Sequence, residues 1–191
     1  MNVPGSSVYV VSALAGNAWH ESHINPTVNQ INGSAFGIYQ WDGSRKDNLL
    51  SWLSENGYDS VDPYGQMEYL IVEDDWVGSF EGISSLNDFL TSTSTDVAML
   101  TEAFCTCWER PGAPSLQDRI DFANEALEYI LLHVDDTDIT EWETEPMYYL
   151  SKEQALKNAV LMYRYYSGSK PTGSKPKRKK KMPVWMMVRY K

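Results

Sequence analysis

The chain has 191 residues, of which 42% are hydrophobic and 22% are charged, proportions that are ordinary for a globular protein. The sequence has no apolar run of the roughly 18 residues that a membrane-spanning helix needs, so we expect no transmembrane span. The formal net charge is −10, and an acidic body argues against nucleic acid as its ligand, because phosphate contacts need Lys and Arg.

The first predicted element is a helix over residues 7–22. Val11, Leu14, Ala15 and Ala18 recur with the spacing of one apolar helix face. A serine at position 6 or 7 is a suitable N-cap. The helix should stop before Asn25-Pro26, because proline disfavours helical backbone in the residue before it.

Residues 24–41 have a different composition. A polar stretch rich in Asn and Gly is followed by a short apolar run from Ala35 to Trp41, and Asp42-Gly43-Ser44 then predicts a turn. We expect a loop or a small β-hairpin near 24–41.

The remaining pattern is helical. Apolar residues return every three or four positions, and the segments are interrupted at Asn56-Gly57 and Arg110-Pro111-Gly112. Ser151 with Gln154 is typical of a capping box. The fold class is therefore α+β and predominantly helical, with further helices over 45–55, 64–76, 86–90, 96–108, 115–134 and 151–166.

The two cysteines, Cys105 and Cys107, are too close in sequence for an easy disulfide. No second pair completes a zinc site, and the histidines show no metal-binding spacing. We interpret both cysteines as small residues of a buried segment. We expect neither a metal nor another cofactor.

Glu21 is the first residue with a possible chemical role. It lies at the edge of the apolar face, in the last turn of the first predicted helix. The helix dipole and partial burial both favour the protonated form of a carboxyl group in such a place. A protonated carboxyl near neutral pH is what a glycosidase uses to protonate a leaving oxygen, although most Glu residues at helix edges are solvated surface residues.

The surroundings of Glu21 resemble a known family. Gly16-Asn17, Glu21-Ser22, Asn25-Pro26, Gly37-Ile38-Tyr39-Gln40-Trp41 and Gly43-Ser44-Arg45 follow one another with spacing similar to that of phage tail lysozymes. That family belongs to the lysozyme-like superfamily, with soluble lytic transglycosylases and goose-type lysozymes. Glu109-Arg110-Pro111, then Arg119 and a helix, continue the resemblance, which covers about residues 5–132.

The resemblance implies a lysozyme-like fold and roles for several residues. Glu21 is expected as the general acid. Ser22 is expected either to orient Glu21 or to bond to the backbone, and Gly37 to allow a close backbone approach. Gln40 would place an amide beside the cleft, and Tyr39 and Trp41 would offer flat faces to sugar rings, unless these aromatic side chains belong to the core. The expected substrate-binding residues are Ser22, Gly37, Tyr39, Gln40 and Trp41.

A second carboxylate is less clearly indicated. A glycoside hydrolase normally needs one as a base or a nucleophile, and Asp42 is the nearest candidate. An Asp before Gly is also what a plain turn favours. Transglycosylases of the same superfamily work with one Glu, so Glu21 alone leaves hydrolysis and transglycosylation both open.

The resemblance divides the chain into three predicted parts. Residues 5–132 form the lysozyme-like domain, 133–169 an acidic linker with an accessory helix, and 170–191 a basic tail. The tail has a net charge of +9 and the preceding part −19. The tail's composition is typical of a flexible linker, but its run of Lys and Arg also suits a polyanion contact or a nuclear signal.

The implied activity is cleavage of the peptidoglycan glycan strand by a phage tail lysin or an endolysin. Bacterial peptidoglycan is the expected partner, with other phage tail or lysin subunits as further partners. The first residues show no signal peptide, so we expect a protein of the virion tail, or one released from the host cytoplasm to the cell wall. The alternatives are a lytic transglycosylase and a non-catalytic wall-binding or structural tail module.

Overall fold

The structure is a computed structural model that describes residues 5–30, 33–113, 115–144 and 149–168. The described residues contain seven α-helices and one π-helical turn, and no β-strand longer than an isolated bridge. The elements are α1 (Val8–Ser22), α2 (Gly43–Glu55), α3 (Pro63–Glu73), α4 (Leu86–Leu90), α5 (Val97–Phe104), the π-helix η1 (Cys105–Glu109), α6 (Leu116–His133) and α7 (Lys152–Tyr166).

The helix predictions are confirmed, together with their start signals. The backbone N–H of Val10 donates to the Ser7 hydroxyl at the start of α1. At the start of α7, Ser151 and Gln154 form the expected capping box. Such contacts satisfy backbone donors that a helix end leaves without partners.

Two segments differ from the prediction. In the described part of residues 24–41, isolated bridges join Asn29 to Phe36 and Phe36 to Trp41, so a compact loop replaces the expected hairpin. The single helix predicted over 96–108 is divided into α5 and the π-helical turn η1, which is followed by Arg110 in a left-handed conformation. Neither a loop held by tertiary contacts nor a π-turn has a periodicity that sequence patterns reveal.

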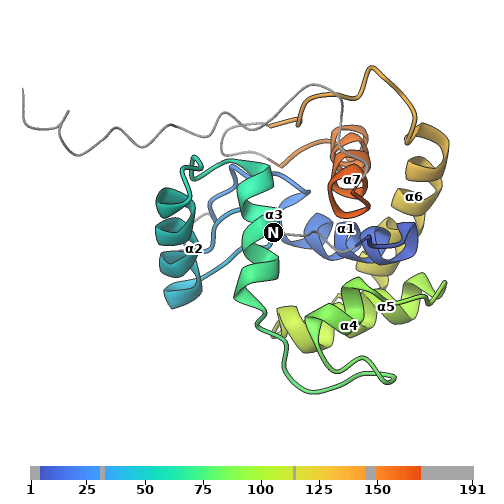
Figure 1. Ribbon diagram of the computed structural model, residues 1–191, viewed down its shortest axis with the longest axis horizontal. Coiled ribbons are helices and arrows are strands. Elements are labelled where there is room, and N and C mark those ends of the chain that lie inside the picture. The colour runs from blue at the N-terminus through green and yellow to red at the C-terminus, as the bar shows by residue number, and fades with distance from the viewer. Residues whose placement is uncertain (1–4, 31–32, 114, 145–148, 169–191) are drawn as a thin grey trace, which may run out of the picture.

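The central helix of the fold is α1, which packs against α5, α6 and α7, whereas α2 and α3 lie together at one side (Figure 1). Ten residues of α1 are buried. Gly16 permits its close approach to α6, because a Cβ there would lie 2.3 Å from the Arg119 carbonyl oxygen and 2.7 Å from the Ala123 Cβ. This contact fixes how α6 is set against the last turns of α1.

The helix α7 belongs to the same hydrophobic core as α1. Ala159, Val160 and Met162 are fully buried, and the Tyr166 hydroxyl donates to the Met67 carbonyl oxygen at 3.1 Å. Arg164 donates to the carbonyl oxygens of Val134, Asp136 and Ile139, so it fastens the acidic linker to the helix. The segment predicted as accessory therefore packs into the core of the main body.

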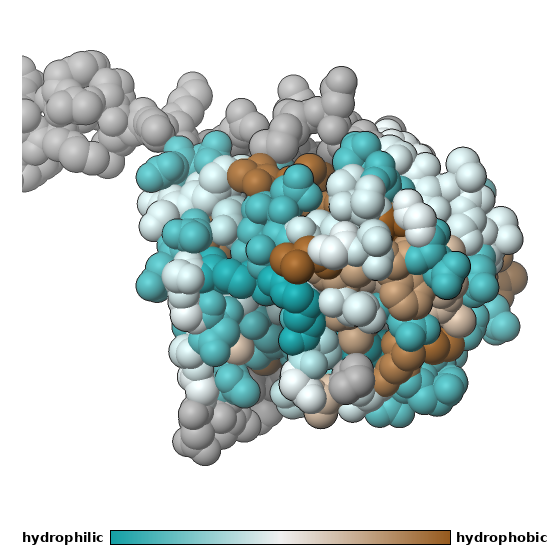
Figure 2. Space-filling view, turned by 90° about the horizontal axis from the view of Figure 1, so that it is seen from below, coloured by the Kyte–Doolittle hydropathy of each residue, from teal (hydrophilic) through white to brown (hydrophobic). Residues whose placement is uncertain are grey.

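The surface is mixed in character. In the view from below, hydrophobic patches lie over the region of α4 and α5, and hydrophilic side chains cover much of the other half (Figure 2). Among the described residues, no helix combines the length and the hydrophobicity that crossing a bilayer requires. The predicted tail, residues 170–191, lies outside the described residues.

Candidate active site

The carboxyl group of Glu21 projects from the last turn of α1 into a pocket. Its side chain is 20% exposed and accepts a hydrogen bond from Arg119 Nη2, with 2.5 Å between Nη2 and Oε1. Arg119 itself is completely buried. This ion pair joins the end of α1 to the start of α6, the contact that Gly16 permits.

Arg119 is oriented by Asn17, one turn before Glu21. Arg119 Nη1 donates to the backbone and side-chain oxygens of Asn17 at 3.3 and 3.1 Å. The Asn17 amide nitrogen in turn donates to the carbonyl oxygens of Ala13 and Thr101, at 2.9 and 3.2 Å. Three helices therefore fix the guanidinium, and a buried charge needs such partners.

A second glutamate, Glu109, enters the pocket from the end of η1. Its Oε1 atom is buried and has no hydrogen-bond partner among the described residues. Burial raises the pKa of Glu109 well above its ordinary value, and the charge of Glu21 adds to this effect, whereas Arg119 and Arg45 oppose it. Glu109 therefore holds its proton more firmly than an ordinary glutamate does.

The opposite side of the pocket is formed by the loop that contains Gly37 and Gln40. Gly37 has φ +80°, and a Cβ there would lie 2.6 Å from Gln66 Oε1. The Gln66 side chain accepts from the Ile38 backbone N–H and donates to the carbonyl oxygens of Pro26 and Ser60. A buried amide from α3 thus holds the loop in the absence of strands.

Ser22 also fastens this loop to α1. Its hydroxyl donates to the Ile38 carbonyl oxygen at 2.7 Å, and Ser22 is fully buried. The Gln40 amide nitrogen donates to the Gly37 and Val28 carbonyl oxygens, at 2.9 and 3.2 Å. Gln40 also lines the pocket. Of the two roles expected for Ser22, the structure shows the bond to the backbone, and this bond holds the loop against α1.

The two aromatic residues of the loop differ in position. Tyr39 lines the pocket although it is only 2% exposed, and its pKa is raised well above the usual value by burial and then by the charge of Glu109. Trp41 is 1% exposed and donates its ring N–H to Glu73 at 2.8 Å. The Trp41 ring packs edge-on against Tyr39 and Trp108, in the aromatic core behind the pocket.

Asp42 lies in an exposed turn at the N-cap of α2. Its carboxylate accepts hydrogen bonds from the Ser34 hydroxyl and from the Gly43 backbone N–H. The hydrogen bond from Ser34 and then that from Gly43 lower the pKa of Asp42. Asp42 therefore stays ionised to a lower pH than an ordinary aspartate.

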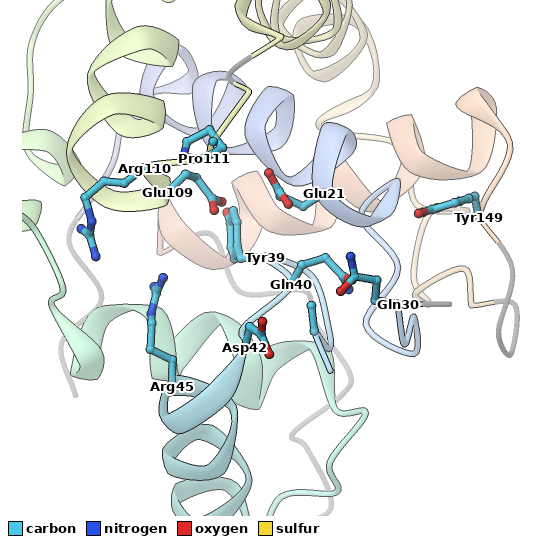
Figure 3. A pocket seen from close by; sticks show the side chains of 12 residues that line it. Glu21, Gln30, Tyr39, Gln40, Asp42, Arg45, Glu109, Arg110, Pro111 and Tyr149 are labelled. Carbon is cyan, nitrogen blue, oxygen red and sulfur yellow. The ribbon is translucent and has the colours of Figure 1, made fainter. Parts of the chain in front are cut away.

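These groups surround one pocket of about 530 Å³, a volume typical of ligand sites (Figure 3). We call Glu21 and Glu109, together with the buried Arg119 that bonds to Glu21, the helical wall, and the loop 33–42 the loop wall. Figure 3 shows Glu21 and Glu109 on one side and Asp42 on the other, with Tyr39 and Gln40 between them. The lining residues are Glu21, Gln30, Ala35, Tyr39, Gln40, Asp42, Arg45, Glu109, Arg110, Pro111, Gly112 and Tyr149.

Four of the seven predicted site residues line this pocket, namely Glu21, Tyr39, Gln40 and Asp42. Ser22, Gly37 and Trp41 are buried behind its surface. The sequence assigns no chemical role to Glu109 or Arg119, although both lie in the motifs that resemble the family. Apart from those motifs, the sequence signal of the position of Glu109 is the end of an apolar run just before Arg110-Pro111-Gly112.

Cationic side chains partly balance the acidic groups. Arg45 bonds to Glu73 at 2.8 Å and lies 4.4 Å from the centre of the Trp108 ring. Arg110 pairs with Asp75 at 2.5 Å. In the described part of the chain, no group of three His, Cys, Asp or Glu residues is arranged to hold a metal ion. The pocket can therefore place a proton-holding carboxyl group, Glu109, and fixed charges, such as that of Asp42, around a neutral polar ligand.

A comparison with known protein families matches residues 2–130 to the phage tail lysozyme family. The chain belongs to the phage tail lysozyme family. The match covers α1 to α6 almost completely and includes both walls of the pocket. Membership indicates a lysozyme-like role in cell-wall lysis, and the predominantly helical structure is consistent with a lysozyme-like fold. A comparison with curated proteins found no match.

Proposed function

We propose that this member of the phage tail lysozyme family cleaves the glycan strand of bacterial peptidoglycan, with Glu21 as the general acid. The observation that carries the proposal is one pocket that contains Glu21 and two further carboxyl groups with opposite pKa shifts. Burial raises the pKa of Glu109, whereas hydrogen bonds lower that of Asp42. Groups whose surroundings separate their pKa values in this way can divide acid and base roles.

In this mechanism Glu21, on the helical wall, protonates the glycosidic oxygen as the bond between that oxygen and the sugar carbon breaks. Asp42, across the pocket, stays ionised and either stabilises the positive charge that develops on the sugar or activates a water molecule. Gln40 and Tyr39 line the pocket between the two walls, where they would contact the sugar. Ser22, Gly37 and Trp41 would act by holding these side chains in place.

A lytic transglycosylase is the second candidate. Asp42 already accepts hydrogen bonds from Ser34 and Gly43 as the cap of α2, so its carboxylate has a structural function that needs no role in catalysis. In a transglycosylase an internal hydroxyl of the substrate attacks instead of water. The same Glu21 then suffices, with no second carboxylate.

The test of the proposed function is Glu21→Gln in the full chain, assayed on purified cell walls by clearing and by the glycan ends released. We expect kcat to fall by about 10² to 10⁴, the usual contribution of general acid catalysis. Glu128→Gln makes the same chemical change on an exposed part of α6 and should leave the rate unchanged. Clearing that survives Glu21→Gln would remove Glu21 as the acid.

The released ends separate the candidates. Reducing ends indicate hydrolysis and anhydro ends indicate transglycosylation. Binding to insoluble peptidoglycan without release of either end would identify a non-catalytic wall-binding module. Action on the cell wall as part of a phage tail or of a released lysin follows from the same proposal.

A further inference from the structure

We propose that Glu109 is the proton-holding partner of Glu21, so that the two carboxyl groups together supply the single proton that glycan cleavage uses. This inference rests on the proposed function, in which Glu21 is the general acid, and adds Glu109 as a second residue that takes part in the proton transfer. The geometry that supports it is the entry of both side chains into one pocket from separate helices (Figure 3).

The first argument is the unsatisfied oxygen of Glu109. Oε1 is buried without a hydrogen-bond partner among the described residues, and buried polar atoms in folded proteins almost always have one. Glu109 also ends a π-helical turn, a local irregularity that is frequent at functional sites. Of the six buried side-chain atoms without a partner among the described residues, Glu109 Oε1 is the only carboxyl oxygen.

The second argument is the charge around Glu109. Negative charge faces it from Glu21 on α1 and Glu73 on α3, and positive charge from Arg119 on α6 and Arg45 on α2. Arg119 is directly bonded to Glu21, and Arg45 to Glu73. Each nearby arginine therefore already has a carboxylate partner, and Glu109 has no ion-pair partner among the described residues.

The proton balance of the reaction fits this pair. One proton leaves the pair for the glycosidic oxygen as the bond between that oxygen and the sugar carbon breaks, and both carboxyl groups are then ionised. Arg119, which faces both, stabilises that state. The attacking hydroxyl, from water or from the substrate, forms the new bond to carbon and releases a proton, which returns the pair to its starting state.

The experiment compares Glu109→Gln with the wild type over a range of pH. Gln fills the same space and is neutral, but it holds no transferable proton. We expect kcat near neutral pH to fall by about 10², and the remaining activity to be confined to more acidic pH. Glu102→Gln, on α5 and outside this pocket, is the matched control and should retain the wild-type rate and pH profile.

A second measurement, the pH dependence of the free energy of unfolding, does not depend on catalytic activity. In the unfolded chain Glu109 titrates near its ordinary pKa of 4.5, and in the folded protein its pKa is raised. As pH rises above 4.5 the unfolded chain releases this proton first, so the wild type loses stability until pH passes the folded pKa. Glu109→Gln lacks this loss, and its stability advantage over the wild type should therefore grow with pH in denaturant titrations.

The outcomes distinguish the two proposals. A wild-type rate and pH profile in Glu109→Gln, together with active wild-type protein, would overturn the role of Glu109 and leave the proposed function standing. A stability difference that does not grow with pH would also overturn it, because Glu109 would then be ionised in the folded protein. Wild-type protein that releases no glycan ends would instead refute the proposed function.

Discussion

The two walls of the pocket can be compared through the carboxyl groups that they carry. On the helical wall, Glu109 lies against packed helices and its pKa is raised by burial. On the loop wall, Asp42 is exposed and its pKa is lowered by hydrogen bonds from Ser34 and Gly43. The same functional group thus acquires opposite properties across one cavity, because helix packing removes water from one side and a turn supplies N–H and O–H donors on the other.

The walls also differ in what holds them. The helical wall depends on a buried cation, since Arg119 joins Asn17 to Glu21. The loop wall depends on a neutral buried amide, since Gln66 bonds to Ile38, Pro26 and Ser60. Loss of the cation should therefore affect stability and charge together, whereas loss of the amide contacts should affect mainly the shape of the loop.

The largest effect is expected for Arg119→Met, which removes the charge from the helical wall. Glu21 and the Asn17 side-chain oxygen would lose their partner, and breaking a buried ion pair in this way typically lowers the free energy of unfolding by about 3 kcal/mol or more. Chemical denaturation measures this change.

The control for Arg119 is the exposed pair of Lys152 and Glu125, whose side chains are 55% and 43% exposed. Lys152→Ala should change the free energy of unfolding by less than about 1 kcal/mol, as is usual for surface pairs. Equal effects of Arg119→Met and Lys152→Ala would contradict the view that the helical wall is built on Arg119.

The next effect concerns Asp42→Asn, which removes the ionised group from the loop wall. If the enzyme is a hydrolase that uses Asp42, kcat should fall by about 10². The free energy of unfolding should change little, because Asn also caps helices well. Steady-state rates on soluble glycan fragments give the answer.

Asp47→Asn, at an exposed position of α2, provides the comparison for Asp42. A wild-type rate in a folded Asp42→Asn protein, with anhydro ends among the products, would assign Asp42 to capping alone. The loop wall would then bind substrate without contributing a charge, and the protein would be a transglycosylase.

The same contrast explains how much of the structure can be predicted from the sequence. The helices follow from local signals, such as the apolar spacing in α1 and the capping box of Ser151 and Gln154, which act within a few residues. Glu21 could be found because it lies at the edge of that apolar face, in the last turn of the helix, and within a recognisable order of motifs. The surroundings of Glu109 could not, because they include charges from α1, α2 and α3, which are remote in sequence.

The loop wall shows the same limit. Gly, Asn and short apolar runs suggest a loop or a small hairpin near 24–41. The structure has a loop in which backbone hydrogen bonds, such as that from Gly37 N–H to the Val28 carbonyl oxygen, are joined by bonds between Ile38 and the side chains of Ser22 and Gln66. A buried glutamine on a neighbouring helix leaves no periodic signal in the loop that it holds. The hairpin alternative is not confirmed, and the shape of the loop depends on tertiary hydrogen bonds that add to the local ones.

The smallest expected effect separates backbone strain from contact in the loop wall. Gly37 and Gly78 both have φ +80°, but a Cβ at Gly37 would lie 2.6 Å from Gln66 Oε1, whereas one at Gly78 would have no atom within 4 Å. Both substitutions by Ala carry the strain of a left-handed backbone, about 1 kcal/mol. Gly37→Ala must also displace the amide that holds Ile38, and we expect it to lower the free energy of unfolding by about 1 to 2 kcal/mol more than Gly78→Ala does.

Denaturant titrations of the two variants measure the difference, and KM for soluble fragments should rise only for Gly37→Ala. Equal losses in the two variants would mean that the loop wall adjusts freely to the added methyl group, and that Gln66 does not set its shape.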